Sequence, residues 1–190
     1  MVSIMTPAPT TLGFALLGLL HQAPQSGYGL RKVFATSALG NYSSSPGAIY
    51  PALGRLSRAR LIESRVDRAR ALRPRRVYRP TPAGTGAFRA WLAQPVTRGD
   101  VERRMDDLML RFAFHANLDS PSDTRRFLAG FLREVEDYLG DLQRQRLAWP
   151  PRMPPHPRLA LQAGIERYRA SARWARTALR HFEARRGRTR

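Results

Sequence analysis

The chain lacks cysteine entirely, so it can form neither a disulfide nor a metal site with thiolate ligands. It also lacks a long apolar run. The longest one near the N-terminus covers residues 12–20, which is too short to span a lipid bilayer. No basic segment precedes that run, as one would in a secretory signal. We therefore expect a soluble, cytoplasmic protein that has no membrane partner.

Acidic residues are scarce. The 190 residues include 33 Lys and Arg but only 14 Asp and Glu, which gives a net charge of +19. Residues 1–95 hold 13 basic and 2 acidic residues, whereas residues 96–190 hold 20 and 12. GC-rich coding explains the preference for Arg over Lys as well as a functional requirement for arginine does. It does not explain the shortage of acids. Because nothing cancels the positive charge of the first half locally, we expect a polyanionic partner, nucleic acid rather than membrane.

No catalytic or metal-binding pattern is visible. The four histidines are scattered without metal-ligand spacing. Neither a glycine-rich phosphate loop nor a serine elbow occurs. Neighbouring acids such as Asp106 and Asp107, or Glu134 and Glu136, are more typical of solvated, salt-bridged helix faces. We therefore expect no catalytic residue, no metal, no cofactor and no enzymatic activity.

The first half predicts three short helices followed by a β-hairpin and a fourth helix. Thr10 and Thr11 can cap the first helix, and Thr81 can cap the last one before Pro82. In the third helix, Ile49, Leu53 and Leu56 belong to one apolar stripe. The expected helices are residues 10–21, 28–38, 46–60 and 81–94, and the expected strands are residues 61–66 and 75–80.

The third helix contains two prolines. Pro46 suits the first helical position, whose amide has no partner within the helix. Pro51 removes a backbone hydrogen bond if the helix begins at Pro46. The sequence leaves open whether Pro51 lies in a late first turn or kinks the helix.

The second half predicts helices throughout. Apolar residues step by 4 and 3 along residues 128–142 and along residues 161–182, on either side of the proline-rich stretch “WPPRMPPHP”. Such heptad seams require a partner helix. The two helices could pair within the chain, but the length of the seams favours a homodimer formed through them.

Three helices and a hairpin are the layout of a winged helix-turn-helix, in which the third helix enters the major groove of DNA. We call the hairpin, residues 61–80, the wing. Arg55 and Arg58 lie off the apolar stripe of the third helix, and five arginines lie within residues 68–76 with no acid among them. A solvated surface is the alternative for this basic loop. The placement of cations on both elements instead favours double-stranded DNA as the partner.

Three blocks, “GYGLRKVF”, “SPGAIYPALGRLSRARLI” and “RRVYRPTPAG”, resemble the signature of the PadR family of transcriptional regulators. That family shows Gly-Tyr at the second helix, Ser-Pro-Gly-x-Ile-Tyr-Pro-x-Leu-x-x-Leu in the recognition helix and Tyr-x-x-Thr-x-x-Gly after the wing. The second half, from “DDLMLRF” to “RHFEARR”, resembles the long helical C-terminal region of larger members.

The resemblance implies a mainly α fold with a small β-hairpin. It divides into a winged helix-turn-helix domain, residues 1–95, and a C-terminal α-helical dimerisation and effector domain, residues 96–190. It further implies a homodimer that binds a pseudo-palindromic operator, usually as a repressor. Two alternatives remain: a non-specific nucleoid or RNA-binding protein, which the charge alone would allow, and an adaptor that uses the heptad helices.

The candidate DNA contacts are chosen for charge, hydroxyl groups or close backbone approach. Arg55 is expected to read a base edge, because arginine commonly reads guanine, and the wing arginines are expected to hold phosphates. Tyr78 is expected to be structural. The candidates are Tyr28, Ser44, Ser45, Gly47, Tyr50, Arg55, Arg58, Arg68, Arg70, Arg73, Arg75 and Arg76.

Some relatives bind small, often aromatic, molecules, so an effector site is a further expectation. Its candidate lining residues, each of which is more typical of core or dimer packing, are Trp91, Phe112, Trp149 and Trp174. Two positions depart from the family pattern. Arg60 stands where members often have glycine, at a cost of roughly 1 kcal/mol if the position is left-handed. Pro80 ends the second strand, which suggests an edge strand there.

Overall fold

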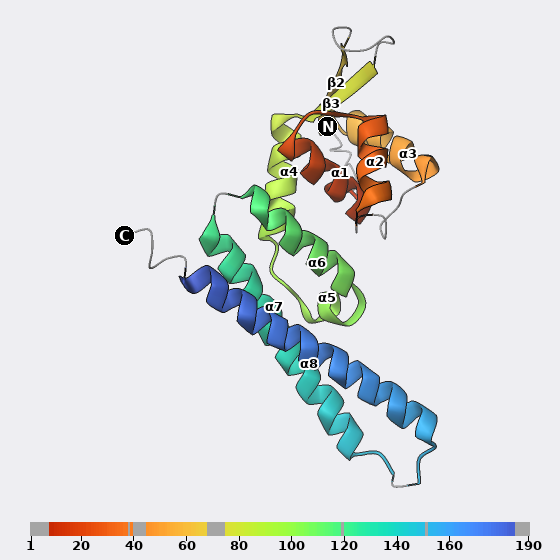
Figure 1. Cartoon of the computed structure of the whole chain (residues 1–190), viewed down its shortest axis with the longest axis vertical. Helices are drawn as coiled ribbons and strands as arrows, with labels where there is room; N and C mark the ends of the chain where they lie inside the picture. The colour runs from red at the N-terminus through yellow and green to blue at the C-terminus, as the bar shows by residue number, and fades with distance from the viewer. Residues whose placement is uncertain are drawn as a thin grey trace, which may run out of the picture. The chain divides into compact units, whose positions relative to one another are not determined.

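The computed structural model describes residues 8–37, 39, 45–67, 75–118, 120–150 and 152–184. The chain divides into two compact units, Met1–Leu92 and Ala93–Arg190, and we describe each by itself. The described residues are mostly helical and include one small antiparallel sheet (Figure 1). This agrees with the predicted fold class. None of the described helices has the length and hydrophobicity that crossing a membrane requires.

The first unit packs four helices against a small sheet. Its core is formed by large apolar side chains that are fully buried, among them Leu16, Phe34, Leu53 and Phe88. In chain order the elements are α1 (Thr11–Gln22), β1 (Gln25–Ser26), α2 (Gly27–Thr36), α3 (Pro46–Arg58), β2 (Ile62–Asp67), β3 (Arg75–Pro80) and α4 (Pro82–Ala93).

Hydroxyl side chains begin the first three of these helices. The Thr10 hydroxyl oxygen accepts a hydrogen bond from the Gly13 amide at 3.3 Å, which confirms Thr10 as the cap of α1. The Ser45 hydroxyl accepts from the Gly47 amide at 3.2 Å and caps α3 directly before Pro46. Because α3 begins at Pro46, Pro51 lies in the second turn, and the helix continues past it to Arg58.

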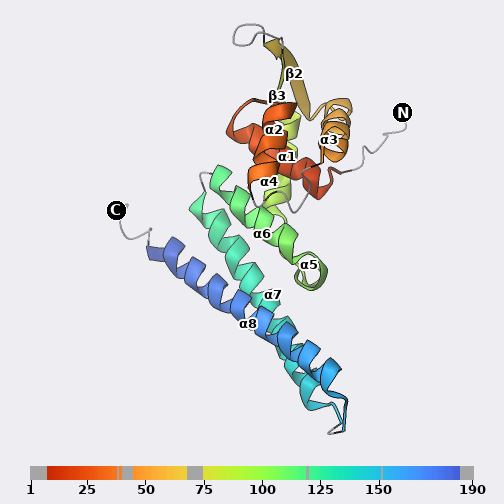
Figure 2. The ribbon, with the colours of Figure 1, turned by 45° about the vertical axis from the view of Figure 1, so that its right-hand side comes forward.

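The two strands form a hairpin as predicted, and their register runs from Ile62 opposite Pro80 to Asp67 opposite Arg75. The expected edge strand at Pro80 is wrong, because β1 pairs with the other side of β3 and gives the order β1-β3-β2. That pairing ends at Tyr78, before it reaches Pro80. In both ribbon views the hairpin extends away from the helices (Figures 1 and 2). Val66, on this hairpin, is 54% exposed.

The start of α4 lies against the chain just after the end of α3. The Thr81 amide donates to the Leu61 carbonyl at 3.0 Å, and the Thr81 hydroxyl donates to the Arg60 carbonyl at 2.7 Å. A Cβ atom on Gly84 would overlap the Leu61 carbonyl. The Thr-x-x-Gly pattern therefore holds α4 in contact with the chain at the end of α3 and so fixes where α3 lies.

Helix α3 ends in a Schellman motif. The Leu61 amide donates to the Leu56 carbonyl and the Arg60 amide donates to the Ser57 carbonyl, both at 2.9 Å. Arg60 has φ 56°, the left-handed conformation that usually selects glycine. Arg60 therefore adopts the left-handed conformation that the family pattern, with glycine at this position, led us to consider.

The second unit is built on a pair of long antiparallel helices (Figures 1 and 2). Its core includes Leu128 and Val135 from one helix and Tyr168 and Ala172 from the other. The heptad seams therefore meet within one chain, which was one of the two alternatives. The elements are α5 (Arg98–Arg103), α6 (Met105–Phe114), a 3-10 turn (His115–Asn117), α7 (Pro121–Leu147) and α8 (Pro155–Ala184).

The boundaries of this unit differ from expectation at two places. Helix α5 was not foreseen. It is held by a capping box in which Thr97 and Asp100 each accept a hydrogen bond from the other's backbone amide. Helix α8 begins at Pro155, inside the proline-rich stretch, because proline suits a first helical turn.

Candidate nucleic-acid interface

Helix α3 has a buried face and an outward face. Ile49, Ala52, Leu53 and Leu56 are buried in the core of the first unit. The outward face has no side chain at its centre, where Gly54 lies. Open space surrounds the position that a Cβ on Gly54 would occupy. A helix surface of this kind can approach another surface closely. The exposed described residues of α3 are Gly47, Tyr50, Pro51, Gly54, Arg55, Ser57 and Arg58.

Two tyrosines are exposed near this face. Tyr28 is 64% exposed and Tyr50 is 49% exposed. The Tyr50 ring lies against Gly27, where an added Cβ would come within 2.6 Å of the ring. The Gly-Tyr pair at the start of α2 therefore places Tyr28 beside the residue that Tyr50 contacts. The Arg31 guanidinium lies 5.3 Å from the centre of the Tyr28 ring and adds a cation to this surface.

The N-terminus of α3 contains two more predicted contacts, Ser45 and Gly47, and both are exposed. The Ser45 hydroxyl accepts a hydrogen bond from the Gly47 amide at this helix start. The positive end of the helix dipole also favours an anion there. Ser44, which was predicted to share this role, lies outside the described residues.

The wing carries both of the acids found before residue 93. Arg75 lies 3.5 Å from Asp67, and Arg79 lies 2.5 Å from Glu63. Within the described residues no carboxylate lies within ion-pair distance of Arg76. The strand charges are therefore partly neutralised at Arg75 and not at Arg76. The predicted contacts Arg68, Arg70 and Arg73 lie outside the described residues.

Sequence reasoning missed two cations of this surface, the exposed Arg65 and the half-buried Arg31. Arg65 lies on β2 opposite Val77, and Arg31 lies on α2 beside Tyr28. Both were detectable in principle. Arg65 lies within the predicted strand 61–66, and Arg31 directly follows a buried position of the second helix.

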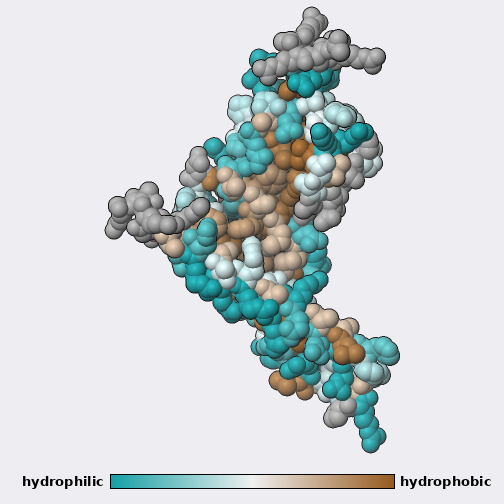
Figure 3. Space-filling model, viewed as in Figure 1, coloured by the Kyte–Doolittle hydropathy of each residue, from teal (hydrophilic) through white to brown (hydrophobic). Residues whose placement is uncertain are grey.

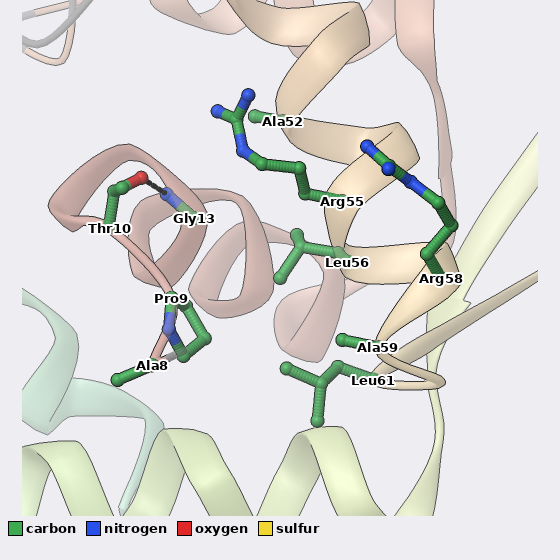
Figure 4. Close-up of a pocket in the computed structure, with 10 residues that line it drawn as sticks. All are labelled: Ala8, Pro9, Thr10, Gly13, Ala52, Arg55, Leu56, Arg58, Ala59 and Leu61. Carbon is green, nitrogen blue, oxygen red and sulfur yellow. Dashed lines mark hydrogen bonds between the residues drawn. The ribbon is translucent and has the colours of Figure 1, made fainter. Parts of the chain in front are cut away.

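Arg55 and Arg58 leave α3 in different directions (Figure 4). The Arg58 Nε donates to the Gly54 carbonyl at 3.4 Å, so this side chain lies back along its own helix. Arg55 and Arg58 both border a pocket of about 400 Å³ between the start of α1 and the end of α3. The two arginines are thus both exposed, but only Arg58 is held by a hydrogen bond to the helix backbone among the described contacts.

The four predicted effector residues fall in three different surroundings. Trp91 stacks on Phe14 at 4.7 Å in the core of the first unit. In the second unit, Phe112 meets Trp174 edge to face at 5.0 Å. Trp149 lines a separate surface pocket at the connection between α7 and α8.

Phe112 also lines the larger cavity of the second unit, about 580 Å³. His115 and Thr124, both buried, supply polar groups to its wall, and Phe182 supplies a second aromatic ring. The His115 ring lies 5.0 Å from Phe127, behind this wall. The cavity could therefore surround a small planar molecule.

Behind the same region lies a buried arginine. Burial lowers the pKa of the Arg111 guanidinium, and the nearby Asp100 carboxylate opposes that shift. Arg111 donates to the Gln94 carbonyl, and its guanidinium lies 5.2 Å from the centre of the Phe127 ring. This arginine is part of the core of the second unit and is not available to a partner.

The described residues contain no group of three or more His, Asp or Glu that could hold a metal ion. Hydroxyls, aromatic rings and guanidinium groups instead make up the candidate surface. These groups bind phosphates and bases, and they offer no evident nucleophile or general base in a common cleft.

Comparison with known proteins gives matches along most of the chain. The model of the transcriptional regulator PadR-like family matches residues 16–90, and that of the virulence activator alpha C-terminal region matches residues 105–183. A comparison with curated proteins gave no match.

Similar solved structures include three structures of two bacterial proteins. Bacillus subtilis PadR in complex with operator DNA is 25% identical, with 91% of this chain and 99% of that chain covered and a TM-score of 0.42. The same protein in complex with p-coumaric acid is 25% identical, with 92% and 99% covered and a TM-score of 0.41. The PadR-like regulator BC1756 from Bacillus cereus is 26% identical, with 92% and 99% covered and a TM-score of 0.40.

Proposed function

Because the chain belongs to the PadR-like family of transcriptional regulators, we propose that it is a repressor that binds a pseudo-palindromic operator as a homodimer. The observation that carries this proposal is the outward face of α3. It combines an exposed tyrosine, two exposed arginines and a side-chain-free centre, and it is held in place by Leu61, Thr81 and Gly84.

In the proposed complex α3 lies in the major groove. Tyr50 and Arg55 contact base edges, and Ser45 with the start of α3 holds a phosphate. The wing arginines and Tyr28 contact the DNA backbone, which sets the register without selecting sequence. A two-fold dimer presents two such helices, so the half-sites should lie about one helical turn, roughly 34–36 Å, apart.

Dimerisation through the C-terminal helices is part of the proposal. Helices α7 and α8 cover each other only in part, and Leu132, Leu139 and Leu179 remain partly buried along their seam. Leu147 is 80% exposed and Leu159 is 62% exposed near the connection between the two helices. Apolar side chains surface at that end of the pair in Figure 3. A second copy of these helices would remove this apolar surface from water.

A small aromatic effector is the remaining part of the proposal. The cavity lined by Phe112, His115, Thr124 and Phe182 suits a planar ring with one polar substituent. Trp174 supports the cavity through its edge contact with Phe112. Occupation of this cavity would act on the unit that we propose to hold the dimer together.

A non-specific nucleoid protein is the competing function, because the net charge of +19 would suffice for it. Footprinting on the DNA upstream of the protein's own gene distinguishes the two. We expect one protected, two-fold symmetric site that is preferred over random duplex by at least ~10³ at physiological salt. A uniform affinity for all duplexes would leave only the nucleoid function.

The variant Arg55→Ala tests the proposed reading residue. We expect the affinity for the operator to fall while the affinity for random duplex changes little, because a base contact is lost. Equal losses on both DNAs would make Arg55 a phosphate contact. Arg89→Ala, which removes an exposed arginine of α4, is the matched control.

A further inference from the structure

The pocket beside Arg55 has the composition of a ligand site. It lies between the first turn of α1 and the last turn of α3, within the first unit, and measures about 400 Å³. This volume lies in the range of small-molecule sites. Most of its wall is apolar, and Figure 4 shows Leu56 and Leu61 pointing from the α3 side toward Pro9 and Ala8.

The polar part of the pocket is positive. The Arg55 guanidinium lies at its rim, above Leu56 and on the side of Thr10 (Figure 4). Thr10 and Gly13, at the capped N-terminus of the 12-residue helix α1, also line the pocket. A helix N-terminus carries positive partial charge. None of the described residues that line the pocket is acidic.

Charge complementarity therefore selects the occupant. We propose that this pocket binds a small monocarboxylate with an apolar body, its carboxylate on Arg55 at the start of α1 and its body against Pro9, Leu56 and Leu61. The Arg55 guanidinium would repel a cationic ligand. A neutral ligand would form no ion pair with this guanidinium. A large polyanion would not fit the apolar floor.

A regulatory consequence follows and rests on the proposed function. If Arg55 contacts DNA bases, it cannot also bind a carboxylate in the pocket, so ligand and operator exclude each other. The site differs from the effector cavity of the second unit, because here the ligand competes directly for a residue of the recognition helix.

The first experiment uses the free protein without DNA. Isothermal titration with decanoate and with 4-phenylbutyrate tests whether the pocket binds apolar monocarboxylates, and decanol is the uncharged control. We expect either acid to bind, and their ratio of affinities distinguishes a chain-like from a ring-like body. The loss of one charge-assisted contact in Arg55→Gln should weaken binding by roughly tenfold or more. Arg89→Ala should bind as the wild type does.

A second variant fills the pocket without touching the cation. Ala59 lines the pocket at the end of α3, and Ala59→Phe should abolish decanoate binding while operator affinity stays unchanged. In the wild type, decanoate should raise the apparent Kd for the operator, and in Ala59→Phe this effect should disappear. If Ala59→Phe does not fold, Arg55→Gln still decides the matter, because Arg55 is exposed and outside the core.

Four results would overturn the proposal. They are equal binding of decanol and decanoate, unchanged binding by Arg55→Gln, binding only after residues 1–7 are deleted, and a change of oligomeric state in Ala59→Phe. Binding only after deletion of residues 1–7 would mean that the chain's own N-terminus occupies the pocket. A change of oligomeric state in Ala59→Phe would mean that a second copy of the chain occupies it. If the protein binds decanoate but shows no preference for an operator over random DNA, the proposed function is refuted and the ligand-site proposal still holds.

Discussion

The two units use arginine in different ways. In the second unit many arginines are paired with acids, as Arg98 is with Glu102 and Asp141, and Arg176 with Glu136. In the first unit the structure describes ten lysines and arginines, and only Arg75 and Arg79 lie within ion-pair distance of a carboxylate. A similar excess of arginine therefore supports internal contacts in one unit and leaves a positive surface in the other.

The comparison explains why net charge alone is a weak guide to the interface. Exposed ion pairs contribute little to stability, typically less than ~1 kcal/mol, but they cancel the field that a polyanion would sense. The first unit, with two acids on one strand, keeps its field. We therefore propose that the first unit binds nucleic acid, and we expect changes to arginines of the second unit to act on folding.

The largest expected effect concerns Arg111 in the second unit. Arg111→Leu should destabilise this unit by about 3 kcal/mol, because it leaves the Gln94 carbonyl and the Asp100 carboxylate without their buried partner. Urea unfolding followed by amide signals of α7 measures the change. Arg133→Leu, which removes an exposed ion pair with Glu134, is the control and should cost less than ~1 kcal/mol. Equal effects would remove the distinction between buried and surface arginines.

The two units should also differ in their stability at acidic pH. Burial alone would raise the pKa of the Asp100 carboxyl, but hydrogen bonds from Thr97 and the charge of Arg104 lower it overall. The pKa of Asp123 is lowered by the Ser120 hydroxyl and Arg126, and that of Asp141 by Arg98. Carboxyls with lowered folded pKa values stabilise the fold above their unfolded pKa, about 3.9, and lose this contribution as pH falls through the folded value.

The second unit should therefore lose stability first below about pH 4. Two-dimensional NMR during an acid titration separates signals of α4 from signals of α8, and those of α8 should broaden or shift at the higher pH. In Asp100→Asn the second unit should be less stable at neutral pH and depend less on pH in the acid range. Simultaneous loss of both sets of signals would argue against a separate acid response.

Wing arginines should differ in their contribution to DNA binding. Arg76→Ala should lower the slope of log affinity against log salt by about one unit, because it removes one unneutralised phosphate contact. Arg75→Ala should lower the slope by less, since Asp67 already neutralises part of its charge. Titrations of both variants at several salt concentrations make the comparison. Identical slopes for both variants and the wild type would remove the wing from the interface.

Local signals in the sequence predicted most of the fold. The capping hydroxyl of Thr10 and the apolar stripe of α3 are local features of the sequence, so α1 and α3 begin within about one residue of where they were expected. Strand β1 was missed because two residues carry no periodicity and are defined only by their pairing with Val77 and Tyr78. The pairing of α7 with α8 could not be separated from dimerisation, because both alternatives use the same heptads.

The candidate site was predicted by residue type rather than by geometry. Sequence identified Tyr28, Tyr50 and Arg55, and the structure shows all three exposed. Sequence could not show that Asp67 neutralises Arg75 or that Arg55 borders a pocket, because both depend on contacts between elements distant in the chain. The predicted effector residues were chosen as aromatics, and most of them pack against other rings.

The smallest expected effect concerns Arg60, where fold and charge oppose each other. Arg60→Gly should stabilise the first unit by about 1 kcal/mol, because glycine adopts the left-handed conformation at φ 56° without a Cβ clash. The same change removes an exposed cation next to the recognition helix and should weaken binding to all DNA slightly. Thermal unfolding and a salt titration of one variant measure both. Arg60→Asn is the matched variant, because asparagine tolerates the conformation and also lacks the charge. A more stable protein with unchanged DNA affinity would show that Arg60 lies outside the interface and that its strain serves no DNA contact.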